Sequence, residues 1–200
     1  TAKKRYILNV HNSEGVQYPE PKLKIMGIEA VKTSTPLPCR DKLKESFKIL
    51  MNGNEKEMKE FCVNFRREFE LLPPEDIGFP RSVNNVEKYS DTTSIYKKGT
   101  PMHVKGALLY NHLLKTKKVS HKHQTIYEGD KGKFVHLRKN PWNANVITFI
   151  GSLPTEFDMH KLIDYEQQFT KSFMDPLRFI LEAINWKVDA SDSNTIEDFF

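Results

Sequence analysis

Two neighbouring apolar stripes with helical spacing constrain the fold of this chain more than any other feature. The first stripe follows Ser34–Pro36, a helix-start signal, and the second ends where the LLPPED stretch interrupts it. The stripes consist of Leu43, Phe47, Leu50 and Met51, and of Met58, Phe61, Cys62, Phe65, Phe69 and Leu72. Their spacing predicts two amphipathic helices. Because only Asn52–Asn54 separates the helices, we expect an antiparallel helical hairpin.

The remaining periodic segments mix strand and helix patterns. KRYILNV and KLKIMGIEAV are rich in strand formers and predict two neighbouring strands on either side of a turn-like YPEP. MHVKGALLYNHLLKT predicts a helix, FVHLRK and NVITFIG predict strands, and HKLIDYEQQFTKSF and MDPLRFILEAI predict a final pair of helices. In the last helix the expected inward residues are Phe173, Leu177, Ile180, Leu181 and Ile184. The chain is therefore expected to be α+β, mostly helical with a small β element.

Two segments lack this periodicity. Residues 73–101 are polar and turn-rich, which predicts an ordered connection with at most one short element, and we expect contacts with a partner there. Residues 115–133 predict an exposed basic loop. No window approaches eighteen apolar residues and no apolar signal-peptide region is present, so we expect a soluble intracellular protein without a membrane partner. Cys39 and Cys62 are expected to be buried thiols in a reducing compartment.

The positive charge is concentrated in one segment. Residues 97–140 contain eleven Lys and Arg, two Asp and Glu, and five His, whereas residues 141–200 contain four Lys and Arg against ten Asp and Glu. Such a block predicts a positive potential that attracts a polyanion, with nucleic acid as the leading candidate. The alternatives are a solvated lysine-rich face, or a stand-alone basic module that binds acidic protein or acts as a scaffold.

Short catalytic signatures do not account for the chain. It has no Walker loop, GxGxxG, HExxH or G-x-S-x-G motif. His121 and His123 fall short of a four-ligand metal set, because neither Cys nor a paired carboxylate accompanies them. We expect no metal site. The tetrapeptide KKRY, before a predicted strand, could direct two cations and an aromatic ring toward a nucleic-acid groove.

Several motifs in one order resemble a known family. AKKRYILNV, EPKLKIMGIE, KTSTP, SVNNVEKY, GTPMHVKGALLYN and IDYEQQFTKSFMDPLRFILEAINW, followed by a Phe-rich end, resemble the C-terminal part of the replicative family B DNA polymerases of large tailed phages. The resemblance implies the end of the palm at 1–21, the thumb at 22–186 and a flexible tail at 187–200. It also implies a thumb whose base combines helices from both ends of the chain, and action in the cytoplasm of the infected bacterium.

The resemblance places catalysis outside this chain. The exonuclease, fingers and catalytic aspartates would precede Thr1, so the fragment should be inactive and hold no cofactor, while the full-length polymerase uses Mg²⁺ and dNTPs. KYSDTTS at 88–94 is similar to the metal-binding YGDTDS turn of the family, but Thr93 replaces its second acid. Binding of two metal ions needs two carboxylates, and only Asp91 is present here. In addition, the turn precedes KKRY in the family, whereas KYSDTTS follows KKRY in this chain. Asp91 therefore has no expected catalytic role.

The resemblance also implies two sets of binding residues. Lys3, Lys4 and Tyr6 would face the minor groove at the primer terminus, where the acceptors of correct base pairs occupy similar positions. Further along the duplex, phosphate contacts would come from Lys22, Lys24, Thr33, Ser34, Ser82, Asn84, Asn85, His103, Lys105 and Gly106. In the TIEDFF tail, Ile196, Phe199 and Phe200 would insert into the sliding clamp. The alternative is a disordered end with accidental phenylalanines.

Overall fold

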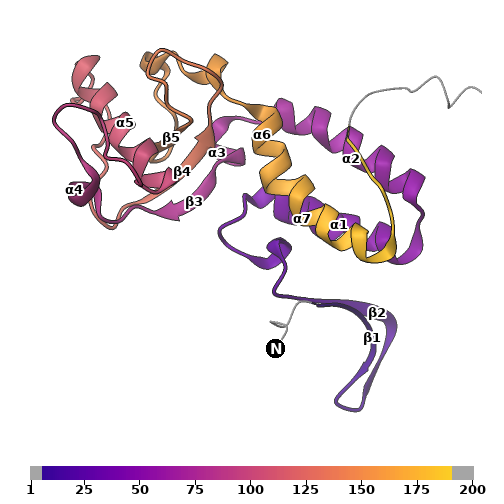
Figure 1. The fold of residues 1–200 in the computed structure, drawn as a ribbon. Helices are drawn as coiled ribbons and strands as arrows, with labels where there is room; N and C mark the ends of the chain where they lie inside the picture. The colour runs from indigo at the N-terminus through magenta and orange to yellow at the C-terminus, as the bar shows by residue number, and fades with distance from the viewer. Residues whose placement is uncertain (1–5, 191–200) are drawn as a thin grey trace, which may run out of the picture. The chain divides into compact units, whose positions relative to one another are not determined.

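The computed structural model describes residues 6–190, and these fall into two compact units. Unit 1 combines both ends of the chain, Thr1–Leu71 and Phe173–Phe200. Unit 2 is the continuous segment Leu72–Ser172 between them. Figure 1 shows the helices of unit 1 and the mixed elements of unit 2 as separate groups. The prediction that helices from both ends of the chain pack together is confirmed.

Unit 1 begins with an antiparallel hairpin of strands β1 (Tyr6–Ser13) and β2 (Val16–Met26). Glu14 and Gly15 form its turn with φ of 53° and 83°, and two consecutive positive φ angles match the twist of a tight hairpin. The prediction of a turn at YPEP is wrong. Pairing is regular from Tyr6↔Met26 to Val10↔Lys22 and resumes at Asn12↔Gln17, so the two prolines lie in the irregular stretch, where their missing N–H groups cost no ladder bond.

The helical hairpin follows as predicted, with α1 at Leu37–Asn52 and α2 at Glu55–Glu70. A short 3₁₀ turn, η1 (Glu29–Val31), precedes α1. The predicted stripes supply the core, because the side chains of Leu43, Phe47, Met58 and Phe69 are fully buried. Phe65 packs edge-on against Phe173, with ring centroids 4.8 Å apart. Cys39 and Cys62 are buried free thiols, and burial raises the pKa of Cys62 to about 12.

The last helices form one uninterrupted helical run instead of a separated pair. Helix α6 (Tyr165–Phe169) continues through a π-helical turn, η4 (Thr170–Met174), into α7 (Asp175–Leu181) and a 3₁₀ turn, η5 (Glu182–Ile184). Pro176, which cannot donate a backbone N–H, directly follows the π-helical turn, where the α-helical hydrogen-bond pattern is already interrupted. Phe173, Leu177 and Leu181 are buried as predicted, whereas Ile184 is 42% exposed.

Unit 2 is built on a three-stranded antiparallel sheet in the order β3-β4-β5, formed by Phe79–Ser82, Lys131–His136 and Val146–Phe149. Helix α5 (Met102–Thr116) packs on β5. Two one-turn helices, α3 (Pro74–Ile77) and α4 (Val86–Tyr89), flank β3, and two 3₁₀ turns, η2 (Thr155–Phe157) and η3 (His160–Leu162), follow the sheet. The sequence predicted at most one short element between 73 and 101, so α3, β3 and α4 correct that prediction.

Buried polar groups tie unit 2 together. The Gln168 side chain accepts a hydrogen bond from the His136 amide at 3.1 Å, lies 2.7 Å from the same residue's ring Nδ1, and donates to the Ile77 carbonyl at 2.6 Å. Asn111 of α5 makes a paired hydrogen bond with the backbone of Ile126, at 2.8 and 2.9 Å. Val119 and Ile126 are buried. The basic segment predicted as an exposed loop is therefore anchored at two points.

Candidate nucleic-acid interface

The β1–β2 hairpin gathers three of the predicted DNA-binding residues on one face. Lys22 lies opposite Val10, Lys24 opposite Leu8, and Met26 opposite Tyr6. Directly opposed residues of an antiparallel pair share a face, and alternate residues of each strand do as well. Tyr6, Lys22 and Lys24 therefore project from the same side of the ribbon. The Lys22 ammonium lies 4.0 Å from the centre of the Tyr18 ring, a cation–π contact. Lys3 and Lys4 lie outside the described residues.

Thr33 and Ser34 occupy the turn before α1 in unit 1. Thr33 is exposed and Ser34 is half-buried, and the Thr35 amide donates to the Lys32 carbonyl at 3.1 Å to close the turn. Pro36 caps α1 without a side-chain hydrogen bond to the helix amides. The turn thus places two hydroxyl side chains beside the N-terminus of a long helix, a position that suits phosphate contacts.

A second predicted group lies in unit 2, where Ser82, Asn84 and Asn85 are exposed after β3. The intervening Val83 is fully buried, and its amide donates to the Asp130 carbonyl at 2.8 Å. Asn85 has the left-handed backbone of φ 62° and ψ 36°, and α4 begins at the next residue. The segment therefore presents three short polar side chains from a backbone that is held at Val83.

The first turn of α5 supplies His103 and Lys105. Pro101 caps α5 without a side-chain hydrogen bond, so the amides of this turn are not capped by a side chain. Burial lowers the pKa of His103, and the positive charge of Arg81 lowers it further. His103 is therefore neutral at pH 7. The Lys105 ammonium lies 5.5 Å from the centre of the Tyr96 ring.

Gly106 is placed in the interior. A Cβ atom at this position would lie 2.5 Å from the Thr148 amide nitrogen and 2.8 Å from the Ile147 carbonyl carbon, so the glycine allows α5 to approach β5 closely. Next to it, the Thr148 hydroxyl donates to the His103 carbonyl at 2.7 Å. The observed role of Gly106 is helix–sheet packing, and its contact with DNA stays a prediction.

Sequence reasoning missed Arg81 and Lys97 near this turn. Arg81 precedes Ser82 at the end of β3 and is close enough to His103 to shift its pKa. Lys97 donates from its amide to the Tyr89 carbonyl at 3.0 Å and from its ammonium to the Lys88 carbonyl at 2.9 Å. Two sequence features could have pointed to these residues: Arg81 directly precedes Ser82, and Lys97 lies in the basic segment 97–140.

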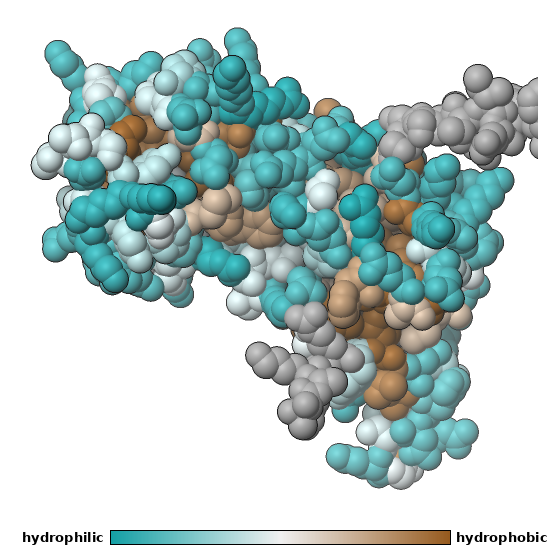
Figure 2. All heavy atoms as spheres, viewed as in Figure 1, coloured by the Kyte–Doolittle hydropathy of each residue, from teal (hydrophilic) through white to brown (hydrophobic). Residues whose placement is uncertain are grey.

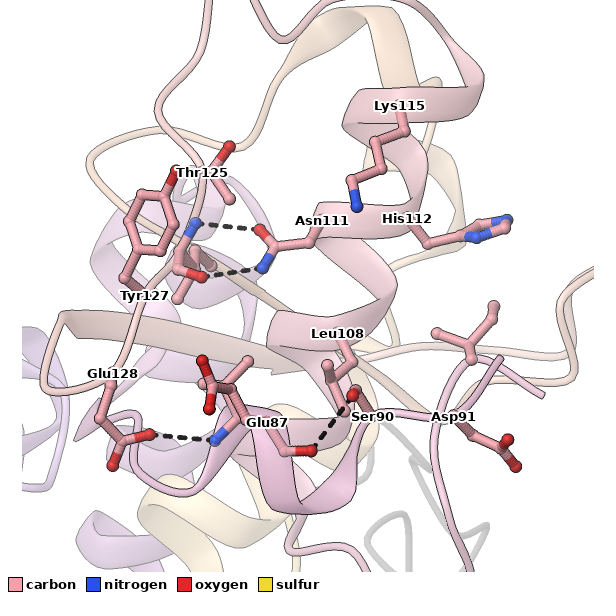
Figure 3. A pocket seen from close by; sticks show the side chains of 13 residues that line it. Glu87, Ser90, Asp91, Leu108, Asn111, His112, Lys115, Thr125, Tyr127 and Glu128 are labelled. Carbon is pink, nitrogen blue, oxygen red and sulfur yellow. Dashed lines mark hydrogen bonds between the residues drawn. The ribbon is translucent and has the colours of Figure 1, made fainter. Parts of the chain in front are cut away.

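A hollow of about 500 Å³ lies between α4, α5 and residues 125–128 (Figure 3). Asn111 reaches across it to the backbone of the facing segment, and Glu87, Asp91, His112 and Lys115 line it. Carboxylates and cations are mixed here, so the hollow carries no single sign of charge. It separates α4 from the basic side chains at the end of α5.

The net charge divides unequally between the two units. Unit 2 contains 15 Lys and Arg against 10 Asp and Glu, whereas unit 1 contains 16 of each. The whole net charge of +5 therefore belongs to unit 2. Exposed apolar side chains are concentrated in unit 1 instead. Among the described residues, every large exposed hydrophobic side chain except Tyr127 is in unit 1. On the face shown in Figure 2, apolar surface is prominent on unit 1 and the surface of unit 2 is mostly hydrophilic.

Comparison with known proteins finds two long matches. The chain is 33% identical over 187 residues to a DNA-directed DNA polymerase of Enterobacteria phage T4, covering 91% of this chain and 20% of that protein. It is 34% identical over 205 residues to a DNA-directed DNA polymerase of Escherichia phage RB69, covering 100% of this chain and 22% of that protein. Over almost its whole length, the chain is homologous to one part of these phage DNA-directed DNA polymerases. It spans about a fifth of the length of these relatives. No family model matches the chain.

Within residues 6–190, no three His, Cys, Asp or Glu side chains are grouped so that they could hold a metal ion. The Asp91 carboxylate instead accepts hydrogen bonds from the Ser94 hydroxyl at 2.8 Å and the Thr93 amide at 3.3 Å, and these bonds lower its pKa. His123 pairs with Glu156 at 3.0 Å. Among the residues that the structure describes, no helix has the length and apolar content needed to cross a membrane.

Proposed function

We propose that this chain is the thumb region, with the end of the palm, of a replicative family B phage polymerase, and that it grips the primer–template duplex. The observation that carries the proposal is the charge division, because the net +5 lies in the unit that contains the exposed Ser82, Asn84 and Asn85 and the half-buried His103 and Lys105. Short polar groups, cations and uncapped helix amides suit phosphates and read no sequence. On the hairpin face, Tyr6 supplies the proposed minor-groove contact at the primer terminus, and Lys22 and Lys24 supply proposed phosphate contacts further along the duplex.

The apolar surface of unit 1 fits a second part of the proposal. Val31, Leu37 and Phe179 are between 45% and 63% exposed, and such side chains cost solubility unless another protein surface covers them. The chain matches only about a fifth of its relatives. We therefore assign this surface to the palm, fingers and exonuclease parts of the same polymerase, which would also hold Mg²⁺ and dNTPs. The polymerase would act in the cytoplasm of the infected bacterium.

The test is binding of the purified chain to a primer–template duplex at several salt concentrations. We expect weak binding with a steep salt dependence, and no nucleotide incorporation. Replacing Lys24 by Ala should weaken binding and reduce the log–log salt slope by roughly one, and replacing Lys3 and Lys4 together should do so more strongly. Lys187→Ala removes an exposed cation of unit 1 outside the proposed contacts and should leave the slope unchanged. Tight binding to acidic protein without DNA affinity would favour the basic scaffold module, and incorporation by the chain alone would contradict its inactivity.

The tail carries the proposed clamp contact. Ile196, Phe199 and Phe200 lie outside the described residues, so the proposal rests on the TIEDFF sequence: an apolar residue, a two-acid spacer and paired aromatics. A flexible tether with an apolar tip binds modestly but raises the effective concentration of the clamp near DNA. Deletion of Thr195–Phe200 should abolish clamp binding and leave duplex affinity unchanged. Loss of duplex affinity on deletion would overturn this assignment.

A further inference from the structure

Two acidic residues interrupt the most basic segment of the chain. Residues 97–140 contain eleven Lys and Arg, and their two acids are Glu128 and Asp130. In a segment proposed to face a polyanion, each carboxylate reduces the attraction. Both of these carboxylates accept hydrogen bonds from backbone amides, and both act at the same short turn of unit 2.

Glu128 holds the segment that follows β3. Its Oε1 accepts a hydrogen bond from the Asn85 amide at 2.8 Å, and its Oε2 accepts one from the Val86 amide at 3.1 Å. Figure 3 shows the second of these bonds at the start of α4. The two bonds fix Asn85 in its left-handed conformation, which costs free energy for a residue other than glycine. A carboxylate that bonds to two consecutive amides offsets that cost.

Asp130 shapes the turn that carries Glu128. Its Oδ2 accepts a hydrogen bond from the Tyr127 amide at 2.7 Å. Its backbone carbonyl accepts from the Val83 amide, and the Gly129 amide donates to the Val83 carbonyl, both at 2.8 Å. The turn at 127–130 therefore holds both Val83 and Asn85 by hydrogen bonds to their backbone. Asn84 lies between these two fixed points and is exposed.

We propose that Glu128 is a positioning residue for DNA binding: its carboxylate pre-organises the Ser82–Asn85 segment, so that the exposed polar groups meet the duplex backbone without further ordering. This inference rests on the proposed function. Ordering a loop in advance removes an entropic cost that binding would otherwise meet. The benefit outweighs the repulsion between one carboxylate and the phosphates, because the Glu128 oxygens are directed to amide donors of the chain itself.

The experiment uses the full 200-residue chain, a primer–template duplex and the variant Glu128→Ala. Removal of an acid raises the net charge, so electrostatics alone predicts tighter DNA binding. The positioning role predicts the opposite sign, a dissociation constant raised roughly fivefold to tenfold, as expected for loss of a charge-assisted hydrogen bond. The salt slope should stay the same because no cation is lost. The matched control is Glu87→Ala, which removes an exposed acid from neighbouring α4 and should leave affinity unchanged or increase it.

Two further readouts separate positioning from a general loss of structure. Glu128→Gln keeps an acceptor oxygen and should restore part of the affinity. The thermal midpoint of Glu128→Ala should stay close to that of the unchanged chain, while the NMR amide signals of Asn85 and Val86 move. If Glu128→Ala binds DNA as tightly as the unchanged chain or more tightly, the inference is overturned and the proposed function stands. If the unchanged chain does not bind duplex DNA at all, both are overturned.

Discussion

At the scale of single residues, Gly106 sets the distance between α5 and β5. Glycine inside a helix normally lowers stability, so alanine there usually adds up to about 1 kcal/mol. Here a Cβ would meet the backbone of Ile147 and Thr148, which cannot move aside as a flexible side chain would. We expect Gly106→Ala to lower the free energy of unfolding by roughly 1–3 kcal/mol, the range for overpacking, in urea denaturation. A gain in stability would show that helix and sheet can separate at little cost.

His103 should couple DNA binding to pH. Its pKa is lowered by burial and then by Arg81, so the folded chain favours the neutral ring. The stability that comes from this shift is present above the ordinary pKa of 6.5 and is lost as the pH falls toward the lower folded value. A nearby phosphate favours the protonated ring, so binding should take up a proton and tighten as the pH falls from 6.5 toward the lowered pKa of His103.

The measurement for His103 is the difference between the unchanged chain and His103→Gln, because the two proteins share every other ionisable group. We expect the variant to show a weaker increase in duplex affinity at low pH and a smaller loss of unfolding free energy. Identical pH profiles for the two proteins would place the ring away from the phosphates.

At the scale of elements, the start of α2 depends on one side chain. Asn54 accepts a hydrogen bond from the Glu57 amide at 3.0 Å, and its amide group donates to the Glu57 carboxylate at 2.7 Å. This reciprocal arrangement keeps α1 and α2 separate across the two residues Gly53 and Asn54. Asn54→Ala should lower the free energy of unfolding by about 1 kcal/mol, measured by urea denaturation. Asn54→Ser retains a capping oxygen and should cost less, so equal losses for both variants would argue against capping.

Long amphipathic elements could be predicted from the sequence, whereas short ones could not. The stripes of α1 and α2 each contain several core residues at helical spacing, and α5 was predicted with its observed bounds. Strand β3 has four residues and includes Pro80, so neither alternation nor strand propensity marks it. It exists because it pairs with β4 from Phe79↔Phe134 to Ser82↔Lys131, a contact between residues far apart in sequence. YPEP reads as a turn by composition, but the hairpin already turns at Glu14 and Gly15.

Prediction of the candidate interface meets the same limit, because contacts between residues far apart in sequence leave no local pattern. Strand alternation is enough to place Tyr6 near the lysines of the next strand, once the pairing register is known. Glu128 could not be found in this way, because a charge count treats it only as one negative charge. Its role depends on two backbone amides more than forty residues earlier in the chain. A pair of acids, Glu128 and Asp130, inside a basic segment is the signal that the sequence offered.

At the scale of the whole molecule, unit 2 should fold without unit 1. It is one continuous segment, and its own core includes Leu109, Tyr110, Phe149 and Phe157, all at most 2% exposed. We expect residues 72–172, expressed alone, to unfold cooperatively on heating, as followed by circular dichroism. Residues 1–71 alone should not, because the core of unit 1 also needs Phe173 and Leu177. Joining 1–71 to 173–190 by a short linker should restore folding, and failure of this chain would contradict the division.

The split of unit 1 between the two ends of the chain sets an order of events on the ribosome. Residues 72–172 leave the exit tunnel before Phe173 does, so unit 2 can finish folding while the helical hairpin of unit 1 still lacks its third helix. Until then the α1–α2 face that later covers Phe173 is open to solvent and to chaperones. The test uses a stalled nascent chain that ends near residue 172 and carries an added spacer to clear the tunnel. In this chain we expect unit 2 to resist protease and the α1–α2 hairpin to be cleaved.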